Sequence, residues 1–173
     1  MQGFAIVVIT ILCSVFYGIL HDQVTVRICI EYFTIGHPPV FDTDSPTLLA
    51  LGWGVIATWW MGLILGVPLA ITARGGSRTK RTALSLVRPL AILLAAMGLL
   101  ALLAGIIGAA LARTGAVFLL EPLASRVPEE VHVSYLGVLW AHSASYLVGF
   151  LGAVVLMVLV WRSRKSSLQE ADA

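Results

Sequence analysis

The side chains best suited to chemistry in this sequence are its histidines and the carboxylates near them. The four histidines are His21, His37, His132 and His142. Imidazole nitrogens and carboxylate oxygens are ligands for zinc and similar divalent ions. The pattern therefore predicts a zinc-like divalent metal as the cofactor, with the ligand set His21, His142, His132 and Glu31.

The spacing of these residues is not that of a standard metal motif. The sequence has no H-E-x-x-H, and no two histidines lie one helical turn apart. A haem held by two histidines is disfavoured, because only His142 lies well inside a predicted membrane helix. Two other interpretations stay open. In the first, His142 only forms a hydrogen bond that fixes its helix against a neighbour. In the second, the remaining histidines only belong to a solvated surface.

A polar pocket at one end of the protein is the wider prediction. His142 lies about six residues from the end of its predicted helix, which is roughly 9 Å at 1.5 Å per residue. An ionisable group within a membrane helix is a functional candidate by default. The residues predicted to share the pocket are His142, His21, Asp22, Glu31, His132 and Tyr146. Such a pocket suits a divalent ion or a polar head group.

The elements that position these side chains are predicted to be apolar helices. Hydrophobic residues make up 59% of the 173-residue chain and charged residues only 12%, about half the roughly 25% typical of a soluble domain. A free-standing soluble enzyme and a disordered chain are therefore excluded. None of the 11 basic and 9 acidic residues lies in 1–21, 45–73, 89–112 or 131–161. Each gap contains an apolar run of about 18 or more residues, the length that spans a hydrocarbon core.

These gaps predict a single membrane domain, residues 1–173, with four transmembrane helices. The helices are expected at 3–20, 47–72, 89–112 and 136–161. The first has no basic residue before it and no small-residue cleavage motif after it, which favours a retained anchor over a cleaved signal peptide. In the second helix, Ser45 is the expected N-cap, Pro46 the first residue and Pro68 a kink.

The basic residues predict the orientation in the membrane. Eight of them lie in the connection 73–88 and the tail 162–173, and three lie in the connections 21–46 and 113–135. Basic residues are enriched on the cytoplasmic side of membrane proteins. We therefore expect both termini in the cytoplasm and the connections 21–46 and 113–135 on the extracytoplasmic side. The expected location is the plasma membrane, as a multi-pass protein of a bacterial inner membrane.

Two stretches of the extracytoplasmic connections, 23–31 and 130–135, alternate between apolar and polar residues. The apolar positions of the first stretch share one face: Val24, Val26, Ile28 and Ile30. A period of two with β-branched residues is typical of a strand. We expect the two strands to pair. The predicted fold class is thus an all-α four-helix transmembrane bundle with a small two-stranded β cap on the extracytoplasmic side. The alternative is that the first helix continues outward through 23–31.

Small residues at every fourth position predict where helix backbones approach closely. They are Gly62, Gly66, Gly105, Gly137, Ala141, Ser145 and Gly149. One interpretation is an interface with a second copy of the chain or with another membrane protein. The simpler one is that these stripes form the internal contacts of a single bundle, since all of them must be buried somewhere in one chain.

Three classes of function remain. The best fit is a membrane assembly or packing protein with a polar extracytoplasmic pocket. The first alternative is a metal-dependent membrane enzyme or a divalent-metal-binding protein that uses the outer histidines and carboxylates. The sequence thus leaves open whether the protein is an enzyme. The second alternative is a transporter component, which is weaker because the cytoplasmic half of each helix is apolar.

The expected partners follow from the same pattern. They are the lipid bilayer and either a second copy of the chain or another membrane protein. Nucleic acid is not an expected partner, because topology and anionic lipid explain the basic connection 73–88.

Overall fold

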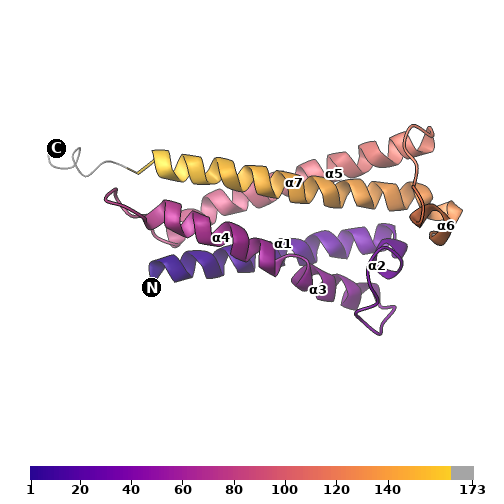
Figure 1. Ribbon diagram of the computed structural model, residues 1–173, viewed down its shortest axis with the longest axis horizontal. Helices are drawn as coiled ribbons and strands as arrows, with labels where there is room; N and C mark the ends of the chain where they lie inside the picture. Colours follow the sequence, from indigo (N-terminus) through magenta and orange to yellow (C-terminus); the bar gives the residue numbers. More distant parts are fainter. Residues whose placement is uncertain (165–173) are drawn as a thin grey trace.

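The computed structural model describes residues 1–164. These residues form an elongated bundle of helices, with residue 1 and residue 164 at the same end (Figure 1). Most of the tail predicted to be cytoplasmic, 165–173, lies outside the described residues.

Four helical segments are long and apolar enough to cross a membrane. They are α1 (Gln2–Ile28), α3 (Pro46–Ile56) continued by α4 (Trp59–Arg74), α5 (Leu84–Arg113), and α7 (His132–Arg162) preceded by the 3-10 helix η1 (Glu129–Val131). Two short helices, α2 (Glu31–Thr34) and α6 (Leu123–Arg126), lie in the connections. The length and composition of the four segments are those of a membrane protein.

The four segments pack as two pairs. α5 and α7 lie side by side, and α1 packs against α3 and α4 (Figure 1). The pairs are joined where α4 contacts α7 and where α1 contacts α5 and α7. We call the end with residue 1, the loop 75–83 and residue 164 the basic end. The opposite end, with residues 29–45 and 114–131, is the histidine end.

The predicted β cap is wrong, because residues 1–164 contain no strand. α1 continues as helix to Ile28 and takes in most of the first predicted strand. The alternation of apolar and polar residues in 23–31 gave a wrong strand prediction because both faces of this helix accept apolar residues. Val24 and Ile28, one turn apart, are 58% and 55% exposed on the outside of the bundle, where lipid favours apolar side chains. Val26 is buried on the inner face.

The second predicted strand is helical as well. Residues 130–135 belong to η1 and to the first turn of α7. The last membrane helix therefore begins at His132, four residues before its predicted start. A helix pairs its backbone groups within itself, whereas a short strand beside the membrane would need a partner strand. The histidine end is thus covered by loops and short helices.

The second membrane segment is interrupted at Ala57 and Thr58, which separate α3 from α4. The hydroxyl of Thr58 donates to the carbonyl of Gly54, and the amide of Thr58 donates to the carbonyl of Val55, a tighter turn than that of an α-helix. The start of the segment is as predicted. Ser45 is the N-cap, with its side chain accepting from the amide of Leu48, and proline occupies the first turn.

Glycines bring α1 close to the second segment. A Cβ atom at Gly54 would lie 2.6 Å from Ile19 Cα, and one at Gly62 would lie 2.6 Å from Ile11 Cα. Gly18 is equally close to Gly54, since a Cβ there would lie 2.6 Å from the Gly54 carbonyl oxygen. Backbones approach this closely only where side chains are small.

The remaining small residues lie mainly between α5 and α7. A Cβ atom at Gly105 would lie 3.2 Å from the carbonyl oxygen of Gly137 and 3.3 Å from the Cβ of Ala141. A Cβ at Gly66 would lie 3.1 Å from Thr10 Cβ on α1. These stripes make contacts within the chain.

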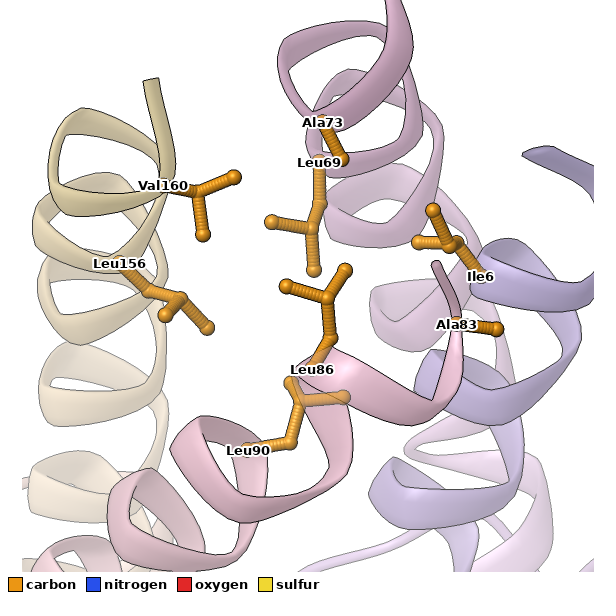
Figure 2. Packing of buried hydrophobic residues seen from close by; sticks show 8 residues of the cluster. All are labelled: Ile6, Leu69, Ala73, Ala83, Leu86, Leu90, Leu156 and Val160. Carbon is orange, nitrogen blue, oxygen red and sulfur yellow. The ribbon is translucent and has the colours of Figure 1, made fainter. Parts of the chain in front are cut away.

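An apolar core fills the basic end (Figure 2). Its buried residues come from all four membrane segments and from the residue just before α5: Ile6, Leu69, Ala73, Ala83, Leu86, Leu90, Leu156 and Val160. Their side chains point toward one another across the bundle axis (Figure 2). The core therefore closes the interior of the bundle at its basic end.

Candidate functional site

Three side chains with metal-ligand atoms meet inside the histidine half of the bundle. They are His21 and Asp22 of α1 and His142 of α7, and one ligand atom from each lies within 4.8 Å of the other two. The two imidazole rings are 4.5 Å apart between centroids and nearly perpendicular, at 82°. His142 Nε2 is 3.8 Å from Asp22 Oδ1. Residues 120 positions apart in the sequence thus form one cluster.

The continued helix of α1 is what positions this cluster. In a helix, residues three and four apart share a face, and Asp22, Thr25 and Val26 are all buried on the same side of α1. The same face carries His21 toward α7. Had residues 23–31 formed a strand, Thr25 would not stand one turn above His21.

Thr25 fixes the orientation of the His142 ring. Its hydroxyl donates to the carbonyl of His21 at 3.1 Å, and the same oxygen lies 3.2 Å from His142 Nε2. Because the hydroxyl has only one proton, its oxygen accepts from Nε2–H. In the neutral ring the lone pair then belongs to Nδ1 of His142. A hydrogen bond of this kind is the usual support of a histidine that binds a metal.

His21 Nε2 is the one buried side-chain nitrogen or oxygen without a hydrogen-bond partner among residues 1–164. A buried polar atom left unpaired costs about 1–3 kcal/mol. Most such atoms in folded proteins are paired, and an exception calls for an explanation in chemistry or in a bound group. This nitrogen lies beside Asp22 and His142 in the same cluster.

The cluster lines a cavity of about 120 Å³. The cavity wall includes a hydrogen bond of 2.7 Å between the hydroxyls of Tyr17 and Ser145. It also includes Tyr146, whose hydroxyl donates to the carbonyl of Ala57 at 3.2 Å. A single buried water molecule needs a cavity of roughly 10–15 Å³. The cavity therefore has room for an ion together with several waters.

Aromatic rings cover the outer side of the cluster. Tyr32 of α2 lies against His142, with 4.5 Å between ring centroids. The ring centroids of His37 and of Trp53 in α3 are 4.5 Å apart. The Nδ1–H of His37 donates to the carbonyl of Tyr32 at 2.8 Å. Burial raises the pKa of Tyr32 above its usual value. The rings of Tyr32 and His37, together with that of Trp53, therefore screen the outer side of the cluster.

The residues predicted for the pocket divide into two groups. His21, Asp22, His142 and Tyr146 all line the cavity. The other two lie at the histidine end, outside the cavity lining. His132, the first residue of α7, donates from Nε2–H to the carbonyl of Val127 at 2.9 Å. Glu31, the first residue of α2, accepts from Cys29 Sγ at 3.3 Å. Both were assigned to the pocket through the predicted β cap, which residues 1–164 do not form.

Four residues of the site did not enter the sequence-based set: Tyr17, Thr25, Tyr32 and His37. A signal for the first two was present. Tyr17, His21 and Thr25 are spaced four apart, as on one face of a helix. That signal becomes visible only when 23–31 is treated as helix. Tyr32 and His37 lie in the connection between α1 and α3, which folds back over the bundle. No local sequence pattern predicts that placement.

Comparison with protein-family models, with curated proteins and with solved structures finds no match to this chain.

Proposed function

We propose that this chain is a multi-pass membrane protein that binds a divalent transition metal of the zinc class inside the bundle. The proposed ligands are His21, Asp22 and His142. The single observation that carries the proposal is their convergence within 4.8 Å from two separate helices. The unpaired Nε2 of His21 supports it, because a metal ion would use that lone pair.

The distances agree with a site that closes slightly on binding. Zinc bonds of about 2.0–2.2 Å place pairs of tetrahedral ligand atoms about 3.4 Å apart. The ligand atoms here lie within 4.8 Å of one another, so small side-chain rotations bring them to an ion. Two imidazoles and a carboxylate form the kind of three-ligand set that leaves a fourth position for water or substrate. The open position favours a reactive or transferring site over a purely structural one.

The other two classes of function have less support. The small-residue stripes that suggested an assembly protein are occupied by contacts within the chain, such as Gly105 against Gly137. A transport path would have to cross the basic end, where the apolar core closes the interior. The cavity is therefore best treated as a pocket that is reached from the histidine end.

The proposed orientation places the histidine end on the extracytoplasmic side of the plasma membrane and both termini in the cytoplasm. Its support is the excess of basic residues at the basic end. A cysteine at Ser77 should react with an impermeant reagent only after the cells are opened, whereas one at Asp42 should react in intact cells. Labelling of position 77 from outside would reverse the orientation.

The metal proposal is tested by elemental analysis of the purified protein and of the protein reloaded with Zn²⁺. We expect about one equivalent in the wild type, by analogy with three-ligand zinc sites, and almost none in His21→Ala and His142→Ala. His132→Ala is the matched control, because His132 lies outside the cluster, and it should keep its metal. Helical content and elution volume verify that each variant is folded. A folded wild type that binds no stoichiometric metal would refute the proposal.

A further inference from the structure

A second hollow lies on the side of the bundle, between α1 and α5, and we call it the lateral groove. Its volume is about 860 Å³, compared with about 120 Å³ for the cavity at the histidine cluster. Its lining comes from α1 between Phe16 and Ile28, from α5 between Leu94 and Arg113, and from η1 and α7 between Glu130 and Ala141. The groove forms because α1 and α5 belong to different helix pairs and meet less closely than the helices within a pair.

The lateral groove is apolar along most of its length. Its walls are formed by apolar side chains that are more than half exposed: Leu20, Val24, Ile28, Leu102 and Ile106. Its floor contains the buried residues Ala101 and Val138. Along a membrane-spanning helix the surroundings are hydrocarbon. The groove is therefore a space that lipid acyl chains fill in preference to water.

The groove has the length of one leaflet of a bilayer. Its lining on α1 begins at Phe16, and Gly98 on α5 lies close to that level, since a Cβ atom there would lie 3.9 Å from Tyr17 Cε2. Phe16 and Gly98 are both near the middle of their helices. From these residues to Ile28 and Arg113, the lining extends about 18–22 Å at 1.5 Å per residue. One leaflet with its head groups is about 20–22 Å thick, which is half of the whole bilayer.

Two charged side chains of opposite sign lie at the mouth of the groove, at the histidine end. They are Arg113, the last residue of α5, and Glu130 of η1, and both are exposed. A Cβ atom at Gly137 would lie 3.2 Å from the Cβ of Ala109. Arg113 follows Ala109 by one turn, and Glu130 precedes Gly137 by about two turns. Neither charged side chain forms an ion pair or a hydrogen bond with another of residues 1–164. The mouth therefore offers one cation and one anion to a ligand.

We infer that the lateral groove binds one phospholipid of the leaflet at the histidine end, with a zwitterionic head group that carries a primary ammonium. An acyl chain lies along the apolar walls, the phosphate lies at Arg113 and the ammonium lies at Glu130. A guanidinium suits phosphate because it donates two parallel hydrogen bonds, and an ammonium donates to a carboxylate in the same charge-assisted way. A purely anionic head group would meet Glu130 with like charge. A membrane helix would cover the apolar walls, but its apolar surface does not complement the charges at the mouth.

The groove and the histidine cavity share a wall. Tyr17, His21 and Leu94 line both of them. A lipid in the groove therefore packs against the outer side of the wall that carries the proposed metal ligand His21. The lipid site goes beyond the proposed function and does not rest on it, because its head-group contacts do not involve the histidine cluster. The two sites are measured separately, as bound lipid and as bound metal.

The test is titration of delipidated full-length protein in detergent with phosphatidylethanolamine, phosphatidylcholine and phosphatidylglycerol that carry the same acyl chains. Native mass spectrometry counts the lipids bound to each protein molecule. We expect one phosphatidylethanolamine to bind roughly 2–5-fold more tightly than phosphatidylglycerol, the range of an exposed ion pair. Phosphatidylcholine should bind more weakly than phosphatidylethanolamine, because its quaternary ammonium has no proton to donate.

Substitutions at the mouth test the head-group contacts. Arg113→Gln should weaken the binding of all three lipids by the same roughly 2–5-fold. Glu130→Gln should remove the preference for phosphatidylethanolamine over phosphatidylglycerol. Arg126→Gln and Glu129→Gln are the matched controls, because they change the charge at exposed residues of the same end that do not line the groove. Both controls should bind lipid as the wild type does.

A substitution in the lower part of the groove tests the position of the acyl chain. Gly98→Leu places a side chain where a long acyl chain ends. It should weaken the binding of long-chain phosphatidylethanolamine by roughly 4-fold for each methylene that it displaces, and it should leave a short-chain form unaffected. Ala96→Leu is the control, because Ala96 is exposed on the same helix and does not line the groove. Helical content and elution volume verify that each variant is folded.

Three results would overturn the inference. The first is equal binding of the three lipids by the wild type, Arg113→Gln and Glu130→Gln. The second is unchanged binding of long-chain lipid by folded Gly98→Leu. The third is a lipid-free dimer that Gly98→Leu disrupts, which would make the groove an interface between copies of the chain. If the protein binds the lipid as expected but no metal, the proposed function falls and the lipid site stands.

Discussion

The two ends of the bundle both bury polar side chains, but they satisfy them differently. At the basic end, Arg164 is 3% exposed, and its guanidinium donates to backbone carbonyls of α4 and of the loop that follows: Thr72, Gly75, Arg78 and Thr79. At the histidine end, His21 Nε2 is buried with no partner among the described residues.

The difference separates a polar group whose hydrogen bonds hold the fold together from one that keeps an atom available for a ligand. The last carbonyls of a helix have no partner within it. Arg164 donates to one of them, that of Thr72, and to three carbonyls beyond α4, which connects α7 to the end of α4. Nothing in that arrangement is free to bind anything else. The histidine end keeps an imidazole nitrogen unpaired beside a cavity, at a cost in stability. A polar group that is costly when unpaired and useful when a ligand is bound is the expected signature of a functional site.

The largest change in the free energy of unfolding should come from a substitution in the apolar core of the basic end. Leu86 is 2% exposed, so Leu86→Ala should lower the free energy of unfolding by about 2–5 kcal/mol, the range for leucine truncation in a packed interior. Leu102 is on the same helix and 58% exposed, and Leu102→Ala should cost far less. The measurement is unfolding of the purified protein in mixed micelles.

The same pair of variants tests whether the ends are separable. Both should bind zinc with wild-type stoichiometry under conditions in which they stay folded, because neither residue is in the histidine cluster. Equal losses of stability for Leu86→Ala and Leu102→Ala would mean that the basic end is not the packed core of the protein.

A substitution at the histidine end should change the free energy of unfolding by less, and should raise it instead of lowering it. His21→Phe replaces a ring with an unpaired buried nitrogen by an apolar ring. In the metal-free protein, this change should raise the free energy of unfolding by about 1–3 kcal/mol, the cost of an unsatisfied buried group, while metal binding is lost. The measurement is again unfolding in mixed micelles, at a fixed pH and without added metal.

Tyr17→Phe is the matched control for His21→Phe. It also removes a polar atom from the cavity wall, but this hydroxyl is paired with Ser145 at 2.7 Å. Losing a satisfied hydrogen bond should lower stability by about 0.5–1.5 kcal/mol. If both variants are destabilised alike, His21 is an ordinary packing residue and the contrast between the two ends disappears.

The sequence predicts the membrane segments well, because their signal is local. Long apolar runs free of charge mark all four, and Ser45 with Pro46 marks the start of the second. The break at Ala57 and Thr58 was not predicted, since neither glycine nor proline stands there. It arises from tertiary packing, where Gly54 allows α1 to approach within contact of the backbone.

The site was predicted in its residue types but not in its assembly. In soluble proteins an alternating pattern distinguishes a buried face from a wet one. At a membrane helix, the outer face is apolar too, so Val24 and Ile28 imitated a strand. That misreading attached Glu31 and His132 to the site and hid Thr25. The pairing of His21 with His142 needs the packing of α1 near α7, which no local pattern contains.

The smallest effect concerns the segment that covers the histidine end. Cys29 is buried in its packing, and that burial raises the pKa of its thiol. The folded protein therefore keeps the thiol neutral at pH values where the unfolded chain ionises it. Stability from this group is complete below the unfolded pKa of about 8.5 and declines as pH rises above it. Cys29→Ala removes the titrating thiol. The stability advantage of the wild type over this variant should therefore shrink between pH 7.5 and pH 9.5.

Glu31→Gln is the control, because it keeps the thiol in place. This variant should retain most of the loss of stability with rising pH, since burial is the main cause of the raised pKa of Cys29. Parallel pH profiles for wild type and Cys29→Ala would show that Cys29 is open to solvent and that the loops do not seal the histidine end.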